Sequence, residues 1–216
     1  MRKLLREQSL TIVTLGLFLL FLSAQAVTGH RAYNLDQQEH QEPTVSFGSY
    51  LRSGHFIEAT FENWESEFLQ MGAYVLLTAF LLQRGSAESR DPDNPEEAES
   101  EPLTDDSPWA AKKSGAVRFA YENSLAIALL AIFVVSFLMH AWGGAMLYSE
   151  EQVSHGGSPV STLEFMRTSE FWFESFQNWQ SEFLAVAGLV ILSIFLRQRN
   201  SPESKPVNAP HSSTGA

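Results

Sequence analysis

The segment Phe61-Glu-Asn-Trp-Glu-Ser-Glu-Phe-Leu69 returns later in the chain as Phe176-Gln-Asn-Trp-Gln-Ser-Glu-Phe-Leu184. The offset of 115 residues holds well beyond this motif, because residues 3–90 align without a gap with residues 118–205. Each copy carries two long apolar runs, one before the motif and one that begins within it. The repeat therefore governs both the architecture and the membrane topology that we expect for the chain.

The apolar runs set the fold class. Ser9–Gly29 and Ser124–Gly144 are each 21 residues long and contain no Asp, Glu, Lys or Arg, while Phe68–Leu82 and Phe183–Leu196 gain length from the motif before them. A helix needs about 20 residues to cross the hydrocarbon core of a bilayer. We therefore expect an all-α integral membrane protein with four transmembrane helices. Because each copy has an even number of spans, the copies form two parallel helical-hairpin repeats.

The N-terminus also resembles a secretory signal, with basic residues ahead of an apolar run and the small-residue pattern Ala24-Gln25-Ala26 near its end. The repeat argues against cleavage, since Ser9–Gly29 aligns with a segment in the middle of the chain. We therefore favour an uncleaved first span, and a mature N-terminus at Val27 would contradict it.

The domain boundaries follow the repeats. We expect a first two-span repeat at 1–84 and a second at 118–200. Between them, 85–117 is predicted to be a disordered cytoplasmic linker, because Asp91–Asp106 contains eight acids and no base and cannot bury enough apolar surface to fold. A solvated spacer is the simpler interpretation of this linker, and an acidic docking arm is the alternative. The tail at 201–216 is predicted to be disordered as well.

The basic residues predict the orientation. With the N-terminus in the cytoplasm, eleven of the fourteen Lys and Arg residues fall on the inner side, and Arg31, Arg52 and Arg167 fall in the outer loops. This asymmetry agrees with the positive-inside rule. We expect a multi-pass protein of the plasma (inner) membrane with both termini in the cytoplasm.

The repeated motif is the candidate site, because its Asn and Glu are four residues apart and share one face of a helix. The candidate ligand-binding cluster joins both motif copies to one histidine of the third span: Asn63, Trp64, Glu67, Asn178, Trp179, Glu182 and His140. Three interpretations stay open. The motif is a membrane-entry device with an interfacial Trp, a hydrogen-bonded cluster that fixes helix register, or a binding site for a proton, a cation or a polar head group.

Histidines add two further hypotheses. His140 could relay protons or hydrogen-bond a neighbouring helix. His40 and His155 share a repeat position in the outer loops, near acidic residues. No metal-ligand spacing supports a site there, so we assign no metal and no other cofactor.

Small residues mark the expected helix contacts. Lipid tails are as apolar as Leu, so helix association must come from close packing and hydrogen bonds. We therefore expect Gly72, Ala73, Gly144 and Gly188 to face partner helices.

The remaining sequence excludes several classes of function. The chain has no Cys, and no nucleophile elbow, P-loop or zinc-protease motif, so we expect no enzyme. It has a net charge of -11 and no basic patch, so we expect no nucleic-acid partner. We expect contacts with membrane lipids and with a second copy or another membrane protein. A non-enzymatic assembly or interaction module is the leading hypothesis, and a small oligomeric transporter or channel with the Glu/Asn cluster at its outer mouth is the alternative.

The doubled Asn-Trp-x-Ser-Glu-Phe-Leu motif, each copy followed by an apolar span and a Gln-Arg or Arg-Gln-Arg stop, resembles a family of uncharacterised bacterial four-span membrane proteins of about this length. The resemblance covers nearly the whole chain except the acidic linker and the tail. It implies a bacterial inner-membrane location and a domain of unknown function. It transfers no catalytic or binding residue.

Overall fold

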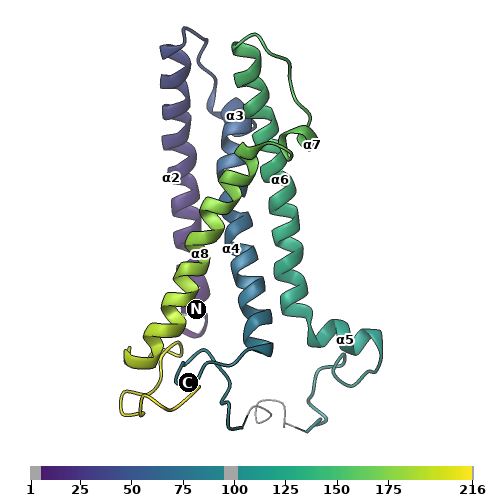
Figure 1. The fold of residues 1–216 in the computed structure, drawn as a ribbon, viewed down its shortest axis with the longest axis vertical. Helices are drawn as coiled ribbons and strands as arrows, with labels where there is room; N and C mark the ends of the chain where they lie inside the picture. The colour runs from purple at the N-terminus through teal and green to yellow at the C-terminus, as the bar shows by residue number, and fades with distance from the viewer. Residues whose placement is uncertain (1–5, 95–101, 216) are drawn as a thin grey trace. The chain divides into compact units, whose positions relative to one another are not determined.

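The computed structural model describes residues 6–94 and 102–215, and the regular structure of these residues is helical with no strand. The helices follow one another along the chain, coloured from purple to yellow in Figure 1, as α2 (Ser9–Glu39), α3 (Phe47–Tyr50), α4 (Gly54–Phe80), α5 (Ala116–Glu122), α6 (Ser124–Ser154), α7 (Thr162–Phe165) and α8 (Ser169–Phe195). The all-α prediction is confirmed. The prediction of disorder falls in part on residues 95–101, which lie outside the described residues.

The helix bounds recur along the chain. α6, α7 and α8 begin at residues 124, 162 and 169, and α2, α3 and α4 begin at residues 9, 47 and 54. Each difference is 115 residues, and the paired helices also have equal lengths of 31, 4 and 27 residues. The offset of the helices is therefore the offset of the repeated sequence.

Three helices in the described part of the chain, α2, α6 and α8, are long and apolar enough to cross a membrane. The expected second span, α4, is not among them, so the structure supports three of the four predicted spans. α4 has sufficient length, but the half that carries the motif is acidic, with Glu58, Glu62, Glu65 and Glu67. These carboxylates lower the mean hydropathy of α4, although the run after the motif is apolar.

The chain divides into two compact units, and each draws on both halves of the sequence. Unit 1 contains Met1–Thr60 and Met139–Thr168, and unit 2 contains Phe61–Leu138 and Ser169–Ala216. One unit boundary falls inside α4, one inside α6 and one directly before α8. These units differ from the repeats, linker and tail expected from the sequence, and that division stays a prediction.

In unit 1, glycines allow the start of α4 to approach the end of α6 very closely. A Cβ atom added to Gly54 would lie 2.5 Å from the backbone nitrogen of Leu147, and one added to Gly143 would lie 2.6 Å from the backbone nitrogen of Glu58. Backbone meets backbone at this crossing, so a larger residue would force the helices apart.

The glycines expected at helix contacts give a mixed result. An added Cβ would lie 2.3 Å from the Phe165 ring at Gly144 and 2.9 Å from the Leu130 side chain at Gly72, so both predictions are confirmed. The prediction for Gly188 is wrong, because nothing lies within 4 Å of the same position there. Small residues are common in membrane helices, and composition alone does not show which of them face a neighbour.

The loops of unit 1 fold back onto their helices through two equivalent contacts. The Asn34 side chain accepts from the Val45 backbone N–H at 2.8 Å and donates to the Val45 carbonyl at 3.0 Å. The Ser149 hydroxyl accepts from the Val160 backbone N–H at 3.0 Å and donates to its carbonyl at 3.1 Å. The Asn and Ser residues are 115 positions apart, as are the two valines, so the same loop geometry recurs with different side chains.

The short helices after these loops are both capped by serine. Ser46 accepts from the Ser49 backbone N–H at the start of α3. Ser161 and Glu164 form a complete capping box at the start of α7. Hydrogen bonds from the Ser161 backbone N–H and hydroxyl hold the pKa of Glu164 below its usual value, so this carboxylate remains an acceptor at mildly acidic pH.

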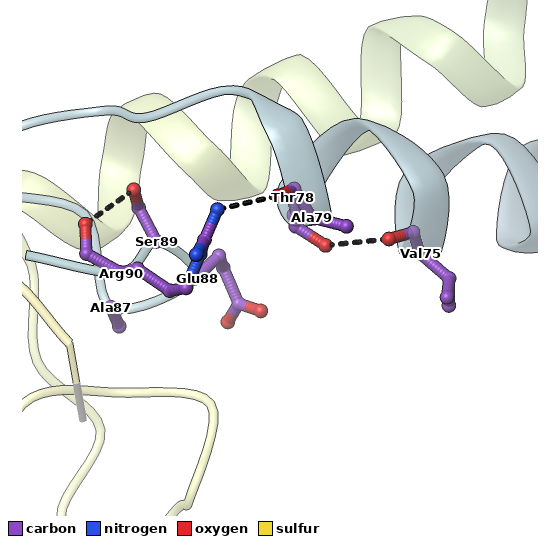
Figure 2. Close-up of a pocket in the computed structure, with 7 residues that line it drawn as sticks. All are labelled: Val75, Thr78, Ala79, Ala87, Glu88, Ser89 and Arg90. Carbon is purple, nitrogen blue, oxygen red and sulfur yellow. Dashed lines mark hydrogen bonds between the residues drawn. The ribbon is translucent and has the colours of Figure 1, made fainter. Parts of the chain in front are cut away.

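Basic side chains cap the ends of α4 and α8 in unit 2. Figure 2 shows the Arg90 guanidinium donating to the Ala79 carbonyl beside a cavity of about 460 Å³. Arg197 donates to the carbonyls of Leu196 at 2.7 Å and Ser193 at 3.3 Å. A cation at a helix C-terminus is favoured by the helix dipole, so these arginines help to end both helices.

The segments that follow α4 and α8 are hydrogen-bonded to each other within unit 2. The Ser86 hydroxyl lies 3.0 Å from that of Ser193. The ammonium of Lys205 is almost fully buried and donates to the backbone carbonyls of Gly85 at 2.5 Å and Ser213 at 2.8 Å. These contacts join the start of the predicted linker to the predicted tail.

The distribution of side chains is that of a membrane protein. Leu19, Leu125 and Leu184 on the apolar helices are 60–70% exposed, whereas Ser136 on α6 and Ser193 on α8 are buried. A water-soluble protein buries its large apolar residues instead. Exposed leucines on helices long and apolar enough to cross a membrane agree with a membrane protein.

Candidate functional site

The two motif copies meet within unit 2 through hydrogen bonds between α4 and α8. Trp179 donates from its indole Nε1 to the Oε1 of Glu65 at 2.9 Å, and Glu65 is completely buried. Asn178 donates from its side-chain amide to the Oε1 of Glu62. Glu62 and Glu65 are three residues apart on α4 and therefore share one face of the helix. Two of the predicted site residues, Asn178 and Trp179, thus belong to a polar cluster between helices.

The acceptors of this cluster were missed by the motif argument, which selected the Asn and the last Glu of each copy. Glu62 and Glu65 are also the positions inside the motif where the copies differ, since the second copy has Gln177 and Gln180 in their place. The sequence signal that could have identified them is a position that is glutamate in one copy and glutamine in the other.

The remaining motif residues lie nearer the surface of unit 2. Glu67 is exposed and Glu182 is half-buried, and the two carboxylates are close enough for a Coulombic interaction. Asn63 is exposed. Trp64 packs edge-on against Phe61, with ring centroids 5.1 Å apart. Two like-charged motif residues, Glu67 and Glu182, therefore lie near the surface of unit 2.

Aromatic packing in unit 2 fixes the direction of the Trp179 indole. Its ring lies edge-on to Phe176 at a centroid distance of 5.5 Å and to Phe133 at 6.2 Å. Trp172 packs edge-on at 6.5 Å. Such edge-to-face pairs favour one ring orientation, and this orientation presents Nε1–H to the Glu65 carboxylate.

His140 lies in unit 1 and is completely buried on α6. Its neighbour from α4 is Glu58, which is also buried, and their ligand atoms lie within 4.8 Å of each other. The glycine-mediated approach of the two helices makes this possible, because Gly143 and Gly144 leave room for the start of α4. A buried carboxylate next to an imidazole can exchange or share a proton.

These features define a class: a helical membrane protein whose described interior is polar and glycine-rich and whose helices carry exposed apolar side chains. The chain belongs to a family described as a domain of unknown function (DUF6766), whose model matches residues 1–216. This confirms the resemblance to an uncharacterised domain family. Searches among curated proteins and among solved structures found no match.

Proposed function

We propose that this chain is a non-enzymatic assembly or interaction module of the plasma (inner) membrane. The main observation that supports this proposal is the hydrogen bond between Trp179 and Glu65, and the hydrogen bond between Asn178 and Glu62 adds to it. These motif side chains are engaged in holding helices together, so no ligand is needed to explain them. Hydrogen bonds of this kind stabilise helix packing in membranes by about 0.5–2 kcal/mol each.

We further propose that α4 is the fourth membrane-crossing segment, so that the chain consists of two parallel helical hairpins with both termini in the cytoplasm. Hydropathy evaluates a helix alone, but two carboxylates of α4, those of Glu62 and Glu65, have partners on α8. A paired carboxylate near the end of a span costs much less than an isolated one at the bilayer centre. The helix bounds that recur after 115 residues support the same arrangement.

A transporter or channel is the second candidate, and one observation favours it. Glu67 and Glu182 interact electrostatically at the edge of the motif cluster. Two neighbouring carboxylates attract cations and protons. Under the proposed topology, they lie near the outer surface, where an oligomer could place the mouth of a pathway.

A flux measurement separates the two functions. The purified protein is reconstituted into liposomes that contain a proton- or cation-sensitive dye, and the Glu67→Gln, Glu182→Gln double variant serves as its matched control. The module predicts the same flux for wild type, double variant and empty liposomes. Wild-type flux that disappears in the double variant would instead establish the transporter.

A further inference from the structure

The buried ammonium of Lys205 folds the end of the chain back onto the segment that follows α4 in unit 2. Lys205 donates to the backbone carbonyls of Gly85 at 2.5 Å, Ser213 at 2.8 Å, His211 at 3.0 Å and Pro210 at 3.4 Å. An ammonium has three N–H groups and accepts no hydrogen bond, so the protein itself supplies enough acceptors for this charge. We call the contact of residues 85–89 with residues 203–215 the linker–tail contact.

Two backbone amides are hydrogen-bonded across the linker–tail contact. The Gly85 N–H donates to the Thr214 hydroxyl at 2.9 Å, and the Gly215 N–H donates to the Ser86 carbonyl at 3.0 Å. Both hydrogen bonds join parts of unit 2 that are far apart in sequence. These two amides are therefore protected from solvent exchange only while the linker–tail contact is closed.

The linker–tail contact also brings together two glutamates at equivalent repeat positions, Glu88 and Glu203. The same turn presents each of them. The Ser86 hydroxyl accepts from the Glu88 N–H and the Ser201 hydroxyl accepts from the Glu203 N–H, both at 3.2 Å. A side-chain hydrogen bond joins Glu88 to Glu203. The repeat thus places one carboxyl group of each copy against the other.

This hydrogen bond requires a proton. An ionised carboxylate only accepts, so two ionised groups form no hydrogen bond and repel each other. Glu88 is half-buried and Glu203 is exposed, and burial favours the neutral form. The proton is therefore assigned to Glu88.

The surroundings of Glu88 agree with this assignment. The titratable groups that face it are Tyr74 on α4, whose hydroxyl donates to it at 3.0 Å, and Glu203. Burial raises the pKa of Glu88 above its ordinary value; the hydrogen bond from Tyr74 lowers this pKa, and Glu203 raises it further. Glu88 thus binds a proton more tightly when the linker–tail contact is closed than when it is open.

We propose that the linker–tail contact is a pH-sensitive latch, which Lys205 closes and which the repulsion of ionised Glu88 and Glu203 weakens. Because closure raises the pKa of Glu88, this contribution to closure is fully present below the ordinary pKa of glutamate. It is lost as the pH rises through the raised value. Under the proposed topology, the latch lies on the cytoplasmic side and responds to the pH there.

The role of Lys205 is tested by hydrogen–deuterium exchange of the detergent-purified full chain, read by mass spectrometry in peptides that contain Gly85 and Gly215. Lys205→Met keeps a long side chain but removes the ammonium. It is expected to raise the exchange rate of both amides at least about tenfold, the scale of lost hydrogen bonds to a charged group. Lys113→Met is the matched control, because Lys113 is exposed, and it is expected to exchange as wild type does.

The role of the glutamate pair is tested by the pH dependence of the same exchange, corrected for the intrinsic rate of each amide. Wild type is expected to be better protected at about pH 5, near the ordinary pKa of glutamate, than at about pH 8. Glu88→Gln is neutral at both values and still donates to Glu203, so its protection is expected to be equal at both. Glu170→Gln alters an exposed glutamate of α8 and is expected to keep the wild-type pH dependence.

Three results would overturn the proposal: wild-type protection that does not change with pH, a pH dependence that persists in Glu88→Gln, or Lys205→Met protected as wild type is. Each variant must elute from gel filtration as wild type does. If Lys205→Met does not, Thr214→Val takes its place, with Gly215 as the amide that reports opening. None of these outcomes depends on whether the protein is an assembly module.

Discussion

At the scale of single residues, Glu65 is one of the fully buried polar side chains among the described residues. It is fully buried and accepts from the packed indole of Trp179. Glu67, two residues further along, is exposed. One helix therefore offers a buried and an exposed glutamate within the same motif.

We expect Glu65→Ala to lower the free energy of unfolding by about 0.5–2 kcal/mol, the range of side-chain hydrogen bonds between membrane helices. Glu65→Gln keeps an acceptor for the indole N–H and should lose less. Unfolding of the detergent-solubilised protein by increasing SDS, followed by Trp fluorescence, measures both. Glu67→Ala is the control and should change stability little; an equal loss there would contradict the importance of the buried pair.

The sequence predicted Asn178 and Trp179 as members of a polar cluster but could not supply their partners. The pairing of Trp179 with Glu65 depends on how α4 and α8 are rotated about their axes relative to each other. The sequence pattern of one helix does not determine that rotation. Glu58 was missed beside His140 for the same reason.

At the scale of helices, the crossing of α4 with α6 in unit 1 depends on residues that have no side chain. Gly54 and Gly143 allow backbone atoms to come within contact distance of each other. Gly188 on α8, by contrast, has open space around its missing side chain. An alanine substitution is therefore expected to have opposite effects on stability at Gly143 and at Gly188.

We expect Gly143→Ala to destabilise the protein by about 1–3 kcal/mol, because the added methyl group meets the backbone of Glu58 and overpacks the crossing. Gly188→Ala should be neutral or stabilise by up to about 1 kcal/mol, because Ala restricts the unfolded chain and favours a helix. The same SDS unfolding measurement compares them. Equal behaviour of the two variants would show that the close approach at Gly143 does not matter.

Helix positions were largely predictable, and the exceptions have physical reasons. α2 and α6 follow from uninterrupted apolar runs whose length matches a bilayer. α8 follows from the shorter run Phe183–Leu196 together with the motif before it. α3 and α7 contain four residues each, too few for any hydrophobic period to be detected. α4 has the expected length, but the glutamates in its first half make its mean hydropathy too low for a membrane span.

At the scale of the whole molecule, the proposed topology makes a direct prediction because the natural chain has no Cys. Single cysteines introduced at Gly48 and at Leu103 should behave differently towards a membrane-impermeant maleimide added to intact cells. Gly48→Cys lies in α3, on the proposed outer side, and should be labelled, since nothing crowds that position. Leu103→Cys lies in the predicted cytoplasmic linker and should be labelled only after the cells are permeabilised.

The control for this measurement is Ser212→Cys in the tail, which should match Leu103→Cys because both are predicted to be cytoplasmic. Labelling of Leu103→Cys in intact cells would mean that α2 and α4 do not form a hairpin. In that case three spans would describe the chain better than four, in agreement with hydropathy alone.

The asymmetry between Glu62 with Glu65 and Gln177 with Gln180 has a consequence for how such a protein can evolve. In a dimer of two identical subunits, every substitution occurs in both subunits. One subunit could therefore not keep two glutamates while the other has two glutamines. Fusion of both copies into one gene removes that restriction. Each half is then free to specialise, one with glutamates that accept hydrogen bonds and the other with neutral glutamines at the same positions.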